Sequence, residues 1–207
     1  MIKEILNSEN VVTDPPFYNI WRKGLLEIGW KIKNEELRSA QIGSLTYVLW
    51  GPKISNQSIV IRVGIGLEKF LNELQEKQGL QKYLTSDELV EGHQTDSLYI
   101  DTCILKYKEQ KCNIILDSEK TKATINKVSD VHSDLLSRFD GDVDSCILAS
   151  TVWSLEDAPK LSTMVNKCNN KGVKVMFMKE FFTELELEIT KDQFYSSFRE
   201  LGMLLNA

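Results

Sequence analysis

The sequence has few histidines and no closely spaced pair of cysteines, and these shortages exclude several kinds of site. Only two histidines occur in 207 residues, His93 and His132, which disfavours histidine-based catalysis. None of the four cysteines belongs to a C-x-x-C pair; they are Cys103, Cys112, Cys146 and Cys168. A zinc site or a disulfide framework is therefore not indicated, and we expect reduced thiols in the cytoplasm.

Long apolar runs are also lacking. No stretch approaches the ~18 apolar residues that a membrane span needs. The N-terminus, MIKEILNSENVV, has neither a basic start followed by an apolar stretch nor a small-residue cleavage site, so secretion is not indicated. These features predict a cytoplasmic protein with no membrane partner.

The composition is that of an ordinary globular chain, with 42% hydrophobic and 27% charged residues. A chain of this length can bury a core as a single domain over residues 1–207. The net charge is −5, yet the segment from Lys106 to Lys127 contains six lysines and only three acids. This local basic excess is compatible with a surface that faces phosphate, although a solvated helix face gives the same pattern.

The order of the expected elements predicts a mixed α/β fold. Strands are expected near 45–50 and 58–63, and an amphipathic helix over 67–79. From residue 98 the pattern is strand, strand, helix, strand, helix, strand, helix. The helix over 121–139 has the clearest apolar face, with Ile125, Val128, Val131, Leu135, Leu136 and Phe139. We therefore expect a central mixed β-sheet flanked by helices.

Carboxylates interrupt the strand-like stretch LYIDTCILKYKEQKCNIILDSEK. Two strands over 98–107 and 112–118, joined by a turn at KEQK, would place Asp101 opposite Asp117, Ser118 or Glu119, and the first and last of these registers bring the acids together. Cross-strand neighbours lie ~4.5–5.5 Å apart at Cβ, close enough to share a cation. Oxygen ligands of this kind suit Mg²⁺ or Ca²⁺ rather than zinc. A solvated edge hairpin, or capping of the next helix, would explain the same acids.

The order of these acids resembles the PD-(D/E)xK nuclease superfamily and, more narrowly, the BamHI-like and BglII-like type II restriction endonucleases. The resemblance lies in Ile100-Asp101, in the acid pair of IILDSEK, and in the helix and strand of INKVSDVHSDLLSRFDGDVDSCILAS. It covers about residues 96–150. It implies a nuclease-like core over about 96–180.

The resemblance also implies roles for these residues. Asp101 and Asp117 would bind Mg²⁺, and Glu119 would hold or deprotonate the attacking water. A fourth acid is expected on a preceding helix, with Glu68 as the candidate and Glu73 and Glu91 as alternatives. Lys120 lies one position beyond the usual motif lysine, which leaves its role open.

These assignments predict an Mg²⁺-dependent endonuclease that cuts double-stranded DNA at a short palindromic site. Such an enzyme is expected to act as a homodimer, because two sites related by two-fold symmetry cut the two strands. The helices over 122–139 and 155–169 are candidates for its interface, and internal core packing is the alternative. The competing hypotheses are a non-catalytic α/β interaction protein and a DNA-binding protein that keeps a nuclease-like fold.

Overall fold

A mixed five-stranded sheet forms the centre of the computed structural model, which describes residues 16–39, 56–83, 89–90, 92–112 and 118–206. The strand order is β1-β4-β5-β6-β7. The strands are β1 (Gln81–Lys82), β4 (Ser97–Asp101), β5 (Ile104–Lys111), β6 (Asp142–Ala149) and β7 (Lys174–Phe177). Strands β1, β4 and β5 are antiparallel neighbours, whereas β5, β6 and β7 run parallel. The predicted mixed sheet is therefore confirmed.

The hairpin between β4 and β5 turns earlier than the sequence analysis predicted. Asp101 pairs with Ile104, so the turn consists of Thr102 and Cys103, and Thr102 adopts a positive φ of 58°. Two-residue hairpin turns use positive φ because it matches the twist of the strands. The predicted turn at KEQK is wrong, since these residues continue β5 to Lys111.

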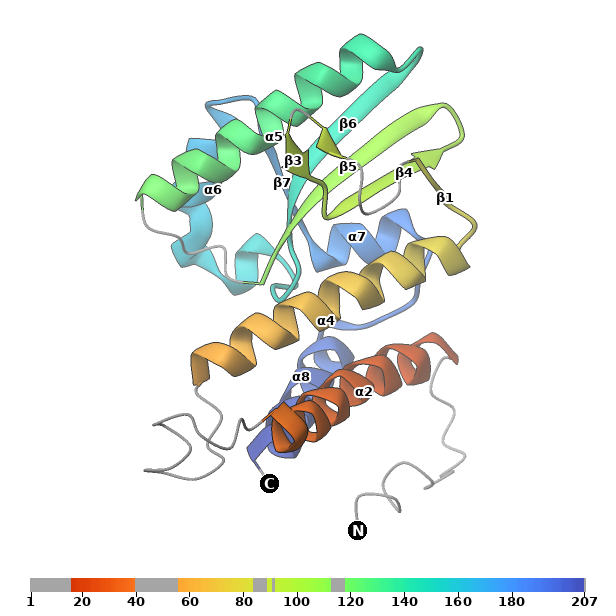
Figure 1. Ribbon diagram of the computed structural model, residues 1–207, viewed down its shortest axis with the longest axis vertical. Coiled ribbons are helices and arrows are strands. Elements are labelled where there is room, and N and C mark those ends of the chain that lie inside the picture. Colours follow the sequence, from red (N-terminus) through yellow and green to blue (C-terminus); the bar gives the residue numbers. More distant parts are fainter. Residues whose placement is uncertain (1–15, 40–55, 84–88, 91, 113–117, 207) are drawn as a thin grey trace.

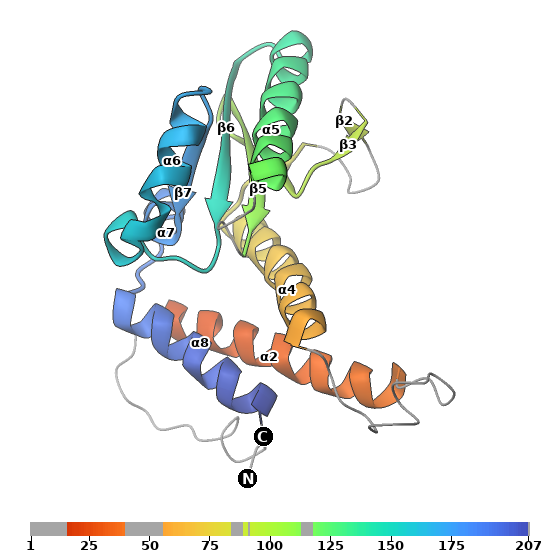
Figure 2. The same cartoon turned by 90° about the vertical axis from the view of Figure 1, so that its left-hand side faces the viewer.

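One face of the sheet is covered by the helices that connect the parallel strands. Helix α5 (Ser118–Arg138) joins β5 to β6, and α6 (Ser162–Asn169) lies between β6 and β7, preceded by the short turns η1 (Leu155–Asp157) and η2 (Pro159–Leu161). The apolar face of α5 packs on alternate sheet residues; the shared cluster includes Ile125, Val128, Val131 and Leu135 with Leu105, Tyr107, Ile147 and Val175. The expected α5 helix is confirmed. Figure 2 shows α5 and α6 beside the strands.

The other face of the sheet packs against α4 (Asn56–Lys77) and α7 (Met178–Glu184), and α2 (Pro16–Ser39) and α8 (Lys191–Asn206) form a further layer. The strand predicted near 58–63 is wrong, because these residues belong to α4. β-Branched residues favour strands only weakly. The helix whose buried face includes Leu67, Leu71 and Leu74 begins before the β-branched residues of 58–63 and contains them. The strand predicted near 45–50 lies outside the described residues.

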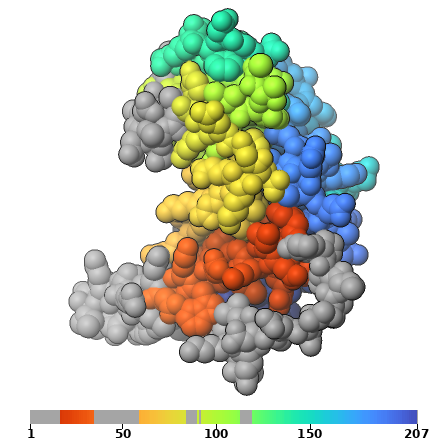
Figure 3. Space-filling model, turned by 90° about the vertical axis from the view of Figure 1, so that its right-hand side faces the viewer, coloured from red at the N-terminus to blue at the C-terminus, as the bar shows by residue number. Residues whose placement is uncertain are grey.

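Aromatic packing joins the helical layers to one another. The Trp21 ring lies 5.5 Å from that of Phe70, 5.1 Å from Phe182 and 5.7 Å from Phe194. These rings come from α2, α4, α7 and α8. Helix α2 approaches α4 closely at Gly24, where a Cβ would lie 2.2–2.7 Å from atoms of the Phe70 ring. On the face shown in Figure 3, α4 lies between α2 and the sheet layer.

A small hairpin of β2 (Leu89–Val90) and β3 (His93–Gln94) precedes β4. In the part of the chain that the structure describes, no helix is long and apolar enough to cross a membrane.

Candidate active site at the end of strand β5

The observed register pairs Asp101 with Ile104 and not with the acids that the predicted hairpin placed opposite it. Asp101 ends β4 and is 44% exposed, with Oδ2 lying 2.6 Å from Nζ of Lys106. Glu119 is exposed in the first turn of α5. The length of β5, roughly 23 Å at ~3.3 Å per residue, separates Asp101 from the end of that strand at Lys111. Asp117 lies outside the described residues.

The candidates for the fourth acid differ in how deeply they are buried. Glu68 is half-buried on α4, whereas Glu73 is exposed on the same helix. Glu91 lies outside the described residues. Lys120 is exposed in the first turn of α5. Glu68 interacts electrostatically with Asp96 and Glu109, the two acids described next.

A cluster of two acids and two lysines lies where β5 ends. We call it the β5-end cluster: Asp96, Glu109, Lys111 and Lys127. Glu109 and Lys111 extend from the same face of β5 because side chains alternate along a strand. Asp96 immediately precedes β4, and Lys127 comes from α5. Three segments of the chain therefore converge on one point.

Glu109 is the buried centre of the β5-end cluster, with a side chain 2% exposed. Its Oε1 lies 2.6 Å from Nζ of Lys111, and its Oε2 lies 2.6 Å from Nζ of Lys127. The Tyr107 hydroxyl donates a 2.8 Å hydrogen bond to Oε2. A carboxylate buried this deeply needs such partners, because desolvation of an unpaired charge is very unfavourable.

Asp96 is held across the hairpin from Glu109. Its Oδ2 accepts a 2.9 Å hydrogen bond from the backbone N–H of Gln110. Nζ of Lys127 lies 3.8 Å from Oδ1, and Nζ of Lys111 lies 4.0 Å from Oδ2. The Asn72 side chain on α4 donates a 2.8 Å hydrogen bond to the Asp96 carbonyl. Helix α4 therefore fixes the backbone from which the Asp96 carboxylate extends.

The acids of this region repel one another. Burial and the charge of Glu109 raise the pKa of Asp96 to about 6. Burial, followed by repulsion from Asp96 and Glu109, also raises the pKa of Glu68. Burial acts to raise the pKa of Glu109, but Lys111 and Lys127 outweigh it and hold this pKa below its usual value. Several buried acids with opposed pKa shifts are typical of functional sites, although ion-pair networks produce them too.

Sequence reasoning missed Asp96, Glu109 and Lys111, yet a signal for them was present. Asp96 precedes one strand, and Glu109-Gln110-Lys111 is an acid-x-lysine triplet at the end of the next. The charged string KEQK was interpreted as a turn. Because the real turn lies at Thr102, this triplet belongs to a strand, where its first and third side chains share a face.

The donor set of the β5-end cluster fits Mg²⁺. Among the described residues, no group of three or more histidine, cysteine, aspartate or glutamate side chains is placed to hold a metal ion. Mg²⁺, however, is usually bound by one or two carboxylates together with water and substrate phosphate. Asp96 and Glu109 supply two carboxylates connected through shared lysines, and Glu68 lies within their field.

A second charged network lies on the opposite face of β5. Lys108 is 2% exposed, and its Nζ lies 2.9 Å from Oε1 of Glu184. It also donates a 3.3 Å hydrogen bond to Gln75 and lies 5.9 Å from the centre of the Phe181 ring. Lys106 joins Glu184 to Asp101. This network ties α7 to the hairpin, which is a structural role for Asp101.

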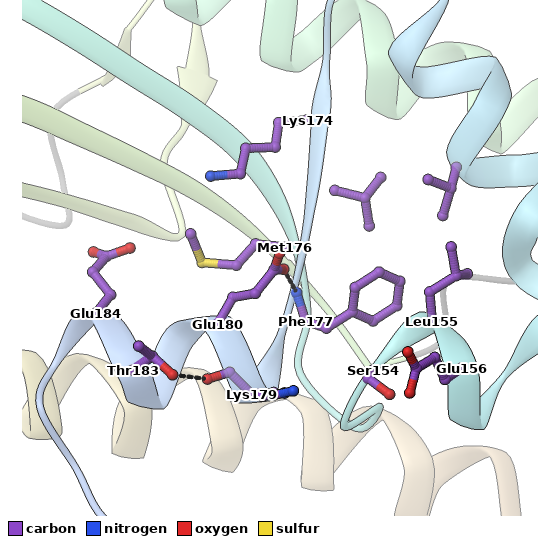
Figure 4. Close-up of a pocket in the computed structure, with 12 residues that line it drawn as sticks. Ser154, Leu155, Glu156, Lys174, Met176, Phe177, Lys179, Glu180, Thr183 and Glu184 are labelled. Atoms are coloured by element: carbon purple, nitrogen blue, oxygen red, sulfur yellow. Dashed lines mark hydrogen bonds between the residues drawn. The ribbon is translucent and has the colours of Figure 1, made fainter.

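A pocket of about 740 Å³ opens beside β7 and α7. Figure 4 shows Lys174 and Glu184 on one side of it and Leu155 and Phe177 on the other. Glu180 uses its carboxylate to accept the Phe177 N–H at 2.8 Å, which caps α7. No member of the β5-end cluster lines this pocket.

Neither a scan of the chain against protein-family models nor a search of curated proteins gives a match.

Proposed function

We propose that this protein is an Mg²⁺-dependent nuclease of the PD-(D/E)xK type that hydrolyses phosphodiester bonds in double-stranded DNA. The observation that carries the proposal is the convergence of Asp96 with Glu109 and Lys111 at the end of an antiparallel hairpin. An acid before one strand and an acid-x-lysine on the next is the motif after which the superfamily is named. An amphipathic helix and a parallel buried strand then follow, in the order expected for that core.

In this proposal the motif consists of other residues than those assigned from sequence. Asp96 and Glu109 would hold the cation in place of Asp101 and Asp117, and Lys111 takes the motif-lysine position, which the resemblance had given to Glu119. Glu68 keeps its assignment as the additional acid on a preceding helix. When bound, Mg²⁺ supplies positive charge against the phosphate and lowers the pKa of the attacking water.

The chain's own residues have distinct tasks in this scheme. Glu109 is held rigidly by Tyr107 and two lysines, so its carboxylate is preorganised. The Lys111 ammonium lies at the same point and can stabilise negative charge that develops on a phosphate oxygen. Glu68, whose pKa is raised by burial and by the charges of Asp96 and Glu109, can exchange a proton with water.

Restriction-type cleavage at a palindrome and a homodimeric state are finer parts of the same proposal. They rest on the resemblance in residues 96–150 and on two-fold symmetry. A homodimer would sediment at about twice the chain mass of 23.7 kDa. A chain that remains monomeric on cleaved DNA would refute the symmetric form and leave the hydrolytic site untouched.

Plasmid cleavage tests the proposal directly. The purified protein should cut supercoiled DNA in Mg²⁺ and fail to cut it in EDTA. Glu109→Gln should slow cleavage at least ~100-fold, in line with metal and acid–base contributions, while Asp130→Asn on the exposed face of α5 serves as the control. Loss of cleavage in Asp101→Asn and Glu119→Gln, with full activity in Glu109→Gln, would return the site to the residues assigned from sequence. No cleavage of any DNA by the wild type would favour the non-catalytic alternatives.

A further inference from the structure

Lys127 stands out because it is outside the acid-x-lysine triplet and yet contacts both acids of the motif. It lies on α5 with a side chain 21% exposed. Its Nζ is 2.6 Å from Oε2 of Glu109 and 3.8 Å from Oδ1 of Asp96. An ammonium in this position bridges the two carboxylates that the proposed function gives to the cation.

The two lysines contact different oxygen atoms of the two carboxylates. Lys111 lies beside Oε1 of Glu109 and Oδ2 of Asp96, and this Oδ2 also accepts a backbone hydrogen bond from Gln110. Lys127 contacts Oδ1 of Asp96 and Oε2 of Glu109, and this Oε2 also accepts the Tyr107 hydroxyl. A cation held by Asp96 and Glu109 would therefore compete with the Lys127 ammonium for the same two carboxylates.

Charge leads to the same conclusion. Asp96 and Glu109 carry two negative charges, which Lys111 and Lys127 balance. A divalent cation added beside both ammonium groups would leave a local positive excess, and repulsion between neighbouring cations is strong where water is partly excluded. Release of one lysine lowers that excess from two charges to one. Lys111 is anchored on the central strand β5, whereas Lys127 reaches in from a helix and can swing outward along its flexible stem.

We propose that Lys127 is a built-in occupant of the cation site, so that a divalent metal binds the β5-end cluster by displacing the Lys127 ammonium. This inference rests on the proposed function, because it takes Asp96 and Glu109 as the metal ligands. Without metal, the Lys127 ammonium balances part of the carboxylate charge of the cluster. Metal binding is therefore weaker than the same carboxylates would show without Lys127.

Calorimetric titration of the DNA-free protein with Mg²⁺, and separately with Ca²⁺, tests the displacement. Lys127→Met removes the charge and keeps most of the side-chain length, and Lys122→Met makes the same charge change at an exposed position of α5. Lys127→Met lacks the charged hydrogen bond that competes with the metal. Its metal Kd should therefore be at least ~10-fold lower than that of the wild type. Lys122→Met should bind like the wild type, and Glu109→Gln should bind no metal.

The outcomes separate this inference from the proposed function. Equal metal Kd values in wild type and Lys127→Met, with binding lost in Glu109→Gln, would overturn the role of Lys127 and leave the metal-dependent nuclease standing. Tighter binding in Lys111→Met and not in Lys127→Met would also overturn it, since Lys111 would be the displaced group. No binding in the wild type or either lysine variant would overturn both.

A second measurement uses the wild-type chain, so it does not depend on a variant that folds. Nuclear magnetic resonance of the lysine Cε and Nζ nuclei reports on each ammonium separately. Saturating Ca²⁺ should shift the Lys127 signals toward values of solvated lysine and leave those of Lys122 unchanged. Lys127 signals that stay fixed while the metal binds would refute displacement.

Discussion

Asp96 gives the sharpest test of whether the β5-end cluster is a functional site or a stabilising network. Its pKa rises from 3.8 to about 6 because of burial first and the charge of Glu109 second. An acid with a raised folded-state pKa stabilises the fold below pH ~4, and this contribution is lost as the pH rises through ~6. At pH 7 the ionised Asp96 therefore makes the native state less stable than a neutral side chain would.

The magnitude follows from the size of the shift. About two pKa units correspond to ~3 kcal/mol at most, and relaxation around the charge reduces this value. Asp96→Asn should therefore raise the free energy of unfolding at pH 7 by about 1–3 kcal/mol, because Asn keeps an oxygen to accept the Gln110 N–H. Between pH 7 and pH 5 the wild type should regain about 1 kcal/mol relative to the variant.

Urea unfolding at pH 7 and pH 5 measures both quantities. Asp130→Asn on the exposed face of α5 is the matched control and should change stability by less than ~0.5 kcal/mol. The difference between wild type and variant cancels the titration of other groups. An Asp96→Asn variant that is less stable by more than ~1 kcal/mol, with no change in pH dependence, would refute the reasoning and make Asp96 a stabilising ion-pair residue.

Three further predictions concern the two faces of β5. Lys111→Met should cut plasmid DNA at least ~100-fold more slowly while filter binding of DNA is retained; full cleavage would remove Lys111 from the site. Glu184→Gln should lower the free energy of unfolding by about 3 kcal/mol, because it leaves the buried Lys108 without its carboxylate, and Lys108→Met in the same chain should restore part of this in urea unfolding. Asp101→Asn should cost less than ~1 kcal/mol by the same method, because Asp101 is 44% exposed; a larger loss would show that its pairing with Lys106 supports the hairpin.

Much of the fold was determined by local sequence signals. The apolar periodicity of 121–139 predicted α5, and the buried runs at 142–151 and 173–180 predicted β6 and β7, although residues 178–180 of the second run belong to α7. These elements form because side chains at helical or alternating spacing bury one face, and such spacing is visible without the fold. The mixed sheet followed from their order. The strand predicted at 58–63 was wrong because β-branched residues occur in helices when tertiary packing favours them.

The site depended on one feature that local sequence did not reveal, the position of a two-residue turn. A turn at Thr102-Cys103 carries no Gly, Asn or Pro, whereas KEQK is charged and looked like a loop. The observed turn changes the hairpin register, and the register decides which side chains lie opposite each other. It therefore brings Asp96 beside Glu109, whereas the predicted turn placed Asp101 opposite the acids after β5. Lys127 was beyond reach from sequence for another reason. Its contact with Glu109 joins a helix to a strand eighteen positions earlier, and only the packing of α5 across the sheet brings that ammonium to a buried carboxylate.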